Sequence, residues 1–290
     1  MLITGLIALS MLVAAIVGWQ VGKVRKAYAT VFAALVCVLL VCGAYLSHHP
    51  AELPEFALCP LTCYLQTSWY APLATVLFYL AASQSFLRSA ENQRTLAKWA
   101  RMQVMLGFLC TAILYAAAAP TLFEPEEILS EINNAQAVNG KPPDRGTFVR
   151  QTLNYTCGPS ACATLLRASG IDANATEAEM AVLCLTRPHA GSSVLGLAAG
   201  LKTKASPQGW HVKIVAPDWS GFMALRKPVV CAMTFNGSPH VVAVLDTDPQ
   251  KGINVADPIG FLGWTPIEEF KREFNGEVVA VFRQDPFEKQ

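Results

Sequence analysis

The side chain best suited to chemistry in this sequence is Cys157, in a segment that reads Gln-Thr-Leu-Asn-Tyr-Thr-Cys-Gly-Pro-Ser-Ala-Cys from Gln151. The small and apolar residues after it predict a helix from Cys157 to Ser169, closed by Gly170. Unpaired N–H groups and the dipole at a helix N-terminus favour an anion, and a thiolate is such an anion. Cys157 is therefore a candidate nucleophile, with a buried structural cysteine as the alternative.

Three further side chains could act with Cys157. His240 opens the apolar segment Pro-His-Val-Val-Ala-Val-Leu, which predicts a strand with the imidazole at its end. Asp257 follows the next predicted strand, where its carboxylate could accept the imidazole N–H and fix the tautomer. Gln151 lies on the approach to the helix and could donate a side-chain N–H to an oxyanion, beside the Cys157 backbone N–H.

Several other reactive residue types have simpler interpretations. Asp246 and Asp248 are alternatives to Asp257, but they belong to the turn after the His240 strand and should point away. His189 and His211 are expected in loops or on the surface rather than in catalysis. Three cysteines are expected in the core, or with one pair in a disulfide: Cys162, Cys184 and Cys231.

Along the chain, most of the predicted helices that position these side chains come before the predicted strands. Besides the Cys157 helix, helices are expected to begin at Thr176, where Glu179 has capping-box spacing, at Ser193 and at Asp218. Strands are expected at residues 211–216, 228–234, 240–245, 252–256 and 277–283. This order indicates an α+β domain with a mainly antiparallel sheet.

Residues 147–284 resemble the bacteriocin-processing, double-glycine-leader cysteine peptidases, a branch of the papain-like fold. That family has a Gln six residues before a Cys-Gly at the head of a helix, then a distant His followed by hydrophobic residues, then an Asp-Pro. Here these positions hold Gln151, Cys157-Gly158, His240 and Asp257-Pro258. The resemblance implies a Cys-His-Asp triad with Gln151 in the oxyanion hole, and cleavage of a peptide bond, often after Gly-Gly in a leader.

The sequence also departs from this family. Thr156 precedes the cysteine where the family often has Asp. The better-known members are cytoplasmic and precede an exporter and its ATPase, whereas this chain contains no Walker-type sequence. We therefore expect no ATP binding and no export-coupled leader removal within this chain, and the cleavage motif is left open.

The N-terminal part predicts a membrane domain, as does a composition with 53% hydrophobic and only 15% charged residues. Four apolar runs are each close to the ~20 residues that a helix needs to cross a bilayer. They cover residues 2–19, 29–46, 70–87 and 102–120. A cleaved signal peptide is the alternative for the first run, but that run lacks a basic start and is followed by basic residues.

Loop charges predict the orientation of this membrane domain, because short loops rich in Lys and Arg stay cytoplasmic. The loops after the first and third runs carry seven basic residues: Lys23, Arg25, Lys26, Arg88, Arg94, Lys98 and Arg101. Residues 47–69 carry none. We therefore expect a multi-pass protein of the cytoplasmic (inner) membrane, with the N-terminus and everything after Pro120 outside.

The predicted organisation is an all-α four-helix transmembrane domain (1–120), a linker (121–146) with a short helical pattern, and the papain-like cysteine peptidase domain (147–290). Residues after 120 hold 15 basic and 18 acidic residues, so no nucleic-acid-binding surface is indicated. Cys59 and Cys63 could form a disulfide or half of a metal site, but no second ligand pair has suitable spacing. We expect no metal and no cofactor.

The function that this sequence predicts is that of a membrane-anchored cysteine peptidase acting on an extracytoplasmic or exported polypeptide. The expected partners are that polypeptide, the lipid bilayer and other membrane proteins. One alternative is a catalytically silent, peptidase-like module for binding or assembly, although such a module has no need to hold Gln, Cys, His and Asp together. Transfer or hydrolysis of a non-peptide amide would use the same residues.

Overall fold

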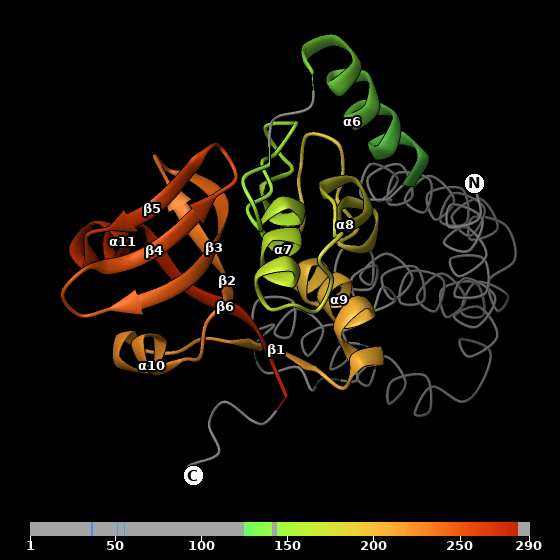
Figure 1. Ribbon diagram of the computed structural model, residues 1–290. Coiled ribbons are helices and arrows are strands. Elements are labelled where there is room, and N and C mark those ends of the chain that lie inside the picture. The colour runs from blue at the N-terminus through green and yellow to red at the C-terminus, as the bar shows by residue number, and fades with distance from the viewer. Residues whose placement is uncertain (1–35, 37–50, 52–54, 56–124, 141–143, 284–290) are drawn as a thin grey trace, which may run out of the picture. The chain divides into compact units, whose positions relative to one another are not determined.

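The computed structural model describes residues 36, 51, 55, 125–140 and 144–283 (Figure 1). The four predicted membrane helices, their orientation and the Cys59–Cys63 pair lie outside these residues. Among the described residues, no helix has the length and apolar character needed to span a bilayer. The chain divides into two compact units, and the one discussed below comprises residues 49–63 and 123–290.

This unit combines helices with one six-stranded sheet, and neighbouring strands pair antiparallel in the order β1-β6-β2-β3-β4-β5. The helices are α6 (Pro125–Asn139), α7 (Cys157–Ala168), α8 (Glu177–Leu183), α9 (Val194–Ala205), α10 (Trp219–Ala224) and α11 (Ile267–Glu273), with the short 3-10 helix η4 (Ser206–Gln208). The strands are β1 (His211–Val215), β2 (Val229–Phe235), β3 (Ser238–Asp248), β4 (Gly252–Asp257), β5 (Phe261–Thr265) and β6 (Phe274–Phe282). The predicted α+β class with an antiparallel sheet is confirmed.

Both faces of the sheet are covered, which explains why the central strands are almost continuously hydrophobic. One face packs against α7 and α9, whereas the other packs against α10 and α11. Successive residues of a strand alternate between these layers. In β3, for example, Ala243 belongs to the core under α7 and α9, while Val242 and Val244 belong to the core with Phe222 and Phe270.

Three helices begin where the sequence provides a capping side chain. The Thr176 hydroxyl accepts from the Glu179 N–H at the start of α8, and Ser193 accepts from the Gly196 N–H at the start of α9. Asp218 caps α10 in the same way, through the Gly221 N–H. Each cap satisfies one of the N–H groups that lack a partner within the helix.

The structure differs from the sequence expectation in several elements. Strand β5 and helix α11 were not predicted, and β3 extends beyond residues 240–245 at both ends. The segment expected as a linker contains α6, which packs against α8 with the side chains of Ile128 and Ile132 fully buried. These two residues are spaced i, i+4 and therefore share one face of the helix.

Candidate active site

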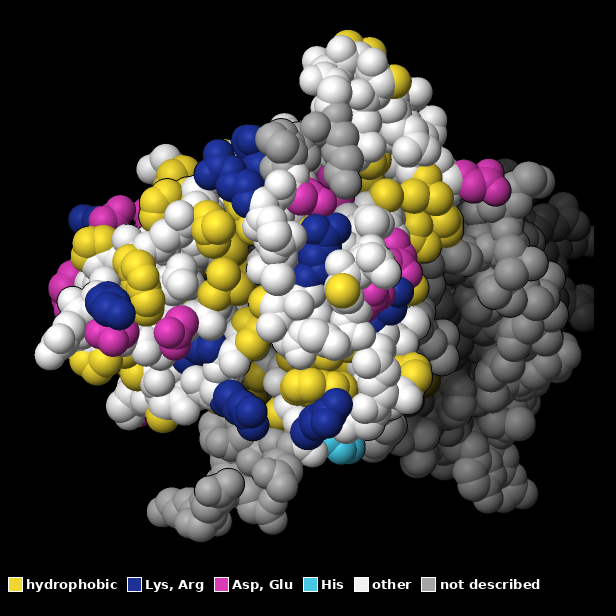
Figure 2. Space-filling model, in the orientation of Figure 1, with side chains coloured by type: hydrophobic (Ala, Val, Ile, Leu, Met, Phe, Trp, Pro, Cys, Tyr) yellow, Lys and Arg dark blue, Asp and Glu magenta, His cyan; other side chains and the backbone are white. Residues whose placement is uncertain are grey.

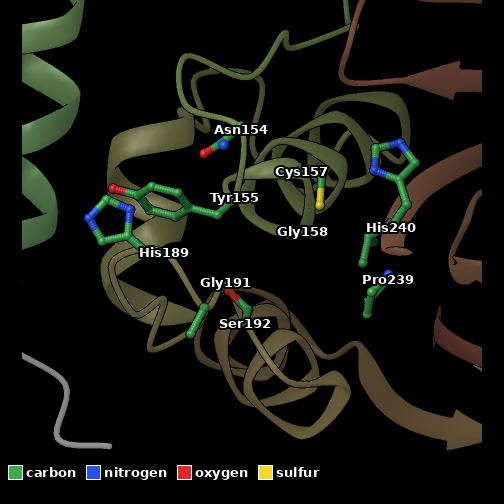
Figure 3. Close-up of a pocket in the computed structure, with 11 residues that line it drawn as sticks. Asn154, Tyr155, Cys157, Gly158, His189, Gly191, Ser192, Pro239 and His240 are labelled. Carbon is green, nitrogen blue, oxygen red and sulfur yellow. The ribbon is translucent and has the colours of Figure 1, made fainter. Parts of the chain in front are cut away.

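Cys157 is the first residue of α7 and is half-buried. Its side chain lines a pocket of about 300 Å³ whose other walls come from three places in the sequence. Asn154 and Tyr155 precede the cysteine, residues 189–192 follow α8, and residues 239–241 belong to β3. Figure 3 shows Cys157 between His240 on one side and Tyr155 with His189 on the other. Cys157 lies at the N-terminus of α7, where the unpaired first-turn N–H groups and the helix dipole favour a negative charge on its sulfur.

His240 and Asp257 are brought together because β3 and β4 are antiparallel neighbours, so the start of β3 lies beside the end of β4. The His240 Nε2–H donates to Asp257 Oδ1 over 2.8 Å, and both side chains are largely buried. The same carboxylate oxygen accepts the Ile259 N–H at 3.1 Å, which helps to fix its position. With Nε2 occupied in this way, Nδ1 is the ring nitrogen left for Cys157.

The electrostatics of the site favour a charged imidazole. Burial of the ring disfavours the imidazolium, but the hydrogen bonds and charges of Asp257 and Cys157 outweigh burial and raise the pKa of His240 from 6.5 to about 9. An imidazolium next to a cysteine at a helix N-terminus stabilises the thiolate form of that cysteine.

Gln151 is held beside the end of β4 by its backbone and side-chain hydrogen bonds. Its backbone N–H donates to the Pro258 carbonyl at 3.0 Å, which ties it to the end of β4. Its side-chain Nε2 donates to the Leu153 carbonyl at 2.8 Å, and its buried Oε1 has no partner within the described part of the chain. Gln151 does not line the described pocket. Its oxyanion role stays a prediction.

Two pocket residues, Tyr155 and His189, were not singled out from the sequence as site residues. Their rings meet edge to face, with centroids 5.4 Å apart, and form the pocket wall away from His240. His189 has a φ of 59°, a left-handed conformation that few residues other than glycine adopt. Residues held in this way gather at functional sites, but a loop histidine carries no sequence signal for it.

The other acidic, histidine and cysteine residues considered from the sequence and described by the structure do not line the pocket. Asp246 and Asp248 lie at the opposite end of β3 from His240. His211 stacks on Phe282 and is hydrogen-bonded to Glu55. Three cysteines are buried as free thiols, so the alternative of a disulfide among them is not observed: Cys162, Cys184 and Cys231.

No family model matches this sequence. An "Uncharacterized protein" of Methanothermobacter thermautotrophicus is 33% identical over 138 residues, which are 47% of this chain and 88% of that protein. This chain belongs to the family of that archaeal protein.

Among solved structures, the chain is similar to a double glycine motif protease from an AMS/PCAT transporter in complex with the leader peptide. That likeness has 20% identity and a TM-score of 0.40, and covers 46% of this chain and 88% of the other. The peptidase domain of Streptococcus ComA, a bi-functional ABC transporter, is similar at 19% identity and a TM-score of 0.41, over 48% and 100% of the two chains. Solved structures similar to this chain thus include double-glycine peptidase domains, the family that the sequence resembles.

Proposed function

We propose that this chain is a cysteine peptidase in which Cys157 is the nucleophile, His240 the acid and base, and Asp257 the residue that orients the imidazole. The observation that carries the proposal is the 2.8 Å hydrogen bond from His240 Nε2 to Asp257, made beside a cysteine at the start of α7. A nucleophile, a base and a group that orients the base are the three parts that covalent acyl transfer requires.

In the proposed reaction the Cys157 thiolate attacks the carbonyl carbon of the scissile bond while His240 is protonated. The backbone N–H of Cys157 and a side-chain N–H of Gln151 stabilise the oxyanion of the tetrahedral intermediate. His240 gives its proton to the leaving amine, and a thioester remains on Cys157. The neutral imidazole then takes a proton from water, which hydrolyses the thioester and restores the thiol.

The proposed substrate is a polypeptide. The end of β4 that carries Asp257 leads into a group of exposed hydrophobic side chains on and beside β5: Ile259, Phe261, Leu262 and Trp264. Figure 2 shows hydrophobic side chains on the surface over this part of the sheet. Exposed apolar groups next to a site suit the binding of an extended or partly unfolded chain.

We further propose that the peptidase domain is anchored to the cytoplasmic membrane and lies outside the cytoplasm. A contact between residue 55 and the catalytic domain supports placing both on the same side of the membrane. Glu55, from the loop that carries no Lys or Arg, accepts at its carbonyl from Lys202 Nζ at 2.6 Å, and its carboxylate is 3.0 Å from His211 Nδ1. Residue 55 and the catalytic domain must then share one side of the membrane. A reporter that is active only outside the cytoplasm, fused after Gln290, should be active, and a silent fusion would refute this orientation.

The test of the peptidase proposal compares cells that carry wild-type protein with cells that carry Cys157→Ala. We expect an uncleaved precursor polypeptide to accumulate only with the variant. Val138→Ala, at a side chain of α6 that is 81% exposed, is a suitable control with the site intact. If the profiles of wild type and Cys157→Ala are identical and a thiol-directed probe does not label Cys157, the protein is a silent binding module.

A further inference from the structure

A buried carboxylate lies behind the segment that leads into Cys157. Glu177, the first residue of α8, is only 3% exposed. Its Oε1 accepts the Thr152 N–H at 2.6 Å and the Thr156 hydroxyl at 2.5 Å, and its Oε2 accepts the Thr152 hydroxyl at 2.5 Å. All three donors belong to residues 151–156, which we call the active-site strap.

The strap is also held on its other side by α6. Gln136 Nε2 donates to the Thr152 hydroxyl oxygen at 3.0 Å, and the Tyr155 hydroxyl donates to Glu131. A chain of donors therefore runs from the α6 amide through the Thr152 hydroxyl to the Glu177 carboxylate. Within the strap, the Leu153 N–H donates to Thr156 Oγ1 at 3.1 Å.

Burial of the Glu177 carboxylate removes its hydration, which is unfavourable unless hydrogen-bond donors replace the lost water. Burial raises the pKa of Glu177, while the hydrogen bonds from Thr152 and Thr156 act in the opposite direction. A buried charge persists only where donors satisfy it, and bonds to a charged acceptor are shorter and stronger than neutral ones. Among the described residues, the hydrogen-bond partners of the Glu177 carboxylate belong to the strap, so the positions of Glu177 and the strap depend on each other.

The strap also contains the groups on which the proposed chemistry depends. Gln151 is at its start, and the Cys157 N–H follows directly after Thr156. Cys157 itself is additionally held by α7, whereas the strap has no regular secondary structure. Loosening the strap should therefore disturb the oxyanion donors more than the contact between the thiol and His240.

We propose that Glu177 is a positioning residue, which fixes the active-site strap so that Gln151 and the Cys157 N–H can hold the oxyanion. This inference rests on the proposed peptidase function and adds a residue to it. Glu177 touches neither substrate nor the reacting sulfur, and acts through Thr152 and Thr156.

The experiment uses two probes on the full chain, with Cys157 followed by mass spectrometry. Iodoacetamide alkylation needs a thiolate but no oxyanion hole, whereas binding of a peptidyl aldehyde creates an oxyanion that must be stabilised. We expect Glu177→Ala to weaken aldehyde binding by about 10- to 100-fold, because displacing an oxyanion donor should cost less than the roughly 100- to 1000-fold loss that follows its removal. Alkylation should change by less than about 3-fold, since the helix dipole and His240 remain.

Two further variants separate positioning from folding. Glu177→Gln keeps the shape and one acceptor oxygen, so it should bind the aldehyde more tightly than Glu177→Ala while unfolding close to the wild-type temperature. Glu179→Ala changes the more exposed carboxylate of the same helix, which pairs with Lys204, and should match wild type with both probes. Equal losses with both probes, or no loss of aldehyde binding, would overturn the role of Glu177. If wild-type Cys157 reacts with neither probe, the peptidase proposal itself fails.

Discussion

Replacement of Asp257 by Asn tests the proposed site most directly, because it keeps the shape of the side chain and removes its charge. The Asn oxygen can still accept from His240 Nε2 and from the Ile259 N–H, so the ring should keep its orientation. What changes is the stabilisation of the imidazolium. Since Asp257 contributes both a hydrogen bond and a charge to the raised pKa of His240, that pKa should fall below about 9 in the variant.

The size of the effect follows from the shift of the His240 pKa from 6.5 to about 9. At 1.36 kcal/mol per pH unit, the full shift corresponds to between about 3 and 4 kcal/mol. Cys157 supplies part of it, and solvent screens the pair, so about 1–2 kcal/mol is expected for Asp257. A raised folded-state pKa stabilises the fold fully below pH 6.5, and this contribution disappears as pH rises through about 9. The stability difference between wild type and Asp257→Asn should therefore be large near pH 6 and small above pH 9.5.

Two measurements check this reasoning. The alkaline limb of kcat/KM for a fluorogenic peptide amide should lie near pH 9 in wild type and at least about one pH unit lower in Asp257→Asn. Urea unfolding at pH 6 and at pH 9.5 should show the stability difference at the lower pH only. An unchanged alkaline limb, or a stability difference that grows with pH, would show that Asp257 does not sustain the charge on His240.

The packing of the domain makes further predictions, all measurable by urea unfolding. Gly196→Ala should lower the free energy of unfolding by about 3 kcal/mol, because a Cβ there would lie 2.4 Å from the Cys184 carbonyl oxygen. Gly170→Ala should cost only about 1 kcal/mol, since this residue has a φ of +68° but open space around it; the reverse order would contradict the packing of α9. Phe222→Ala should cost about 3–5 kcal/mol, because its ring is fully buried beneath the sheet, and a cost under 1 kcal/mol would exclude that burial.

The features that could be predicted from the sequence are those that local chemistry determines, such as the starts of helices. Thr176, Ser193 and Asp218 each begin a helix because their side chains accept a first-turn N–H, and this requires no distant partner. The His240–Asp257 pair could also be anticipated, since a histidine that opens one strand meets a residue that ends the next when the two strands are antiparallel.

The elements that were not predicted are those whose position depends on contacts with distant parts of the chain. Strand β5 is at the edge of the sheet, and its residues Phe-Leu-Gly-Trp-Thr are half or fully exposed, so no buried face marks it in the sequence. Helix α11 follows Pro266 and has five charged residues among seven, with Phe270 as its buried anchor. Its position depends on the core formed with Phe222 and Phe274, which come from other segments.

Glu177 shows the same limit within the site. The spacing of Thr176 and Glu179 explains the start of α8, so Glu177 reads from the sequence as an ordinary acidic residue of a first turn. Only the fold shows that Thr152 and Thr156 lie against it, more than twenty residues earlier in the chain.

Helix α6 precedes the catalytic domain in the chain, and its contacts with that domain were not predicted from the sequence. The sequence predicted only a short helical pattern within a linker here, whereas the helix extends to Asn139 and buries the side chains of Ile128 and Ile132. Yet the polar residues Glu131 and Gln136 bond to the active-site strap. A displacement of α6 would therefore remove contacts from Tyr155, in the pocket wall, and from Thr152, the main partner of Glu177. The geometry of the site thus depends on the position of α6.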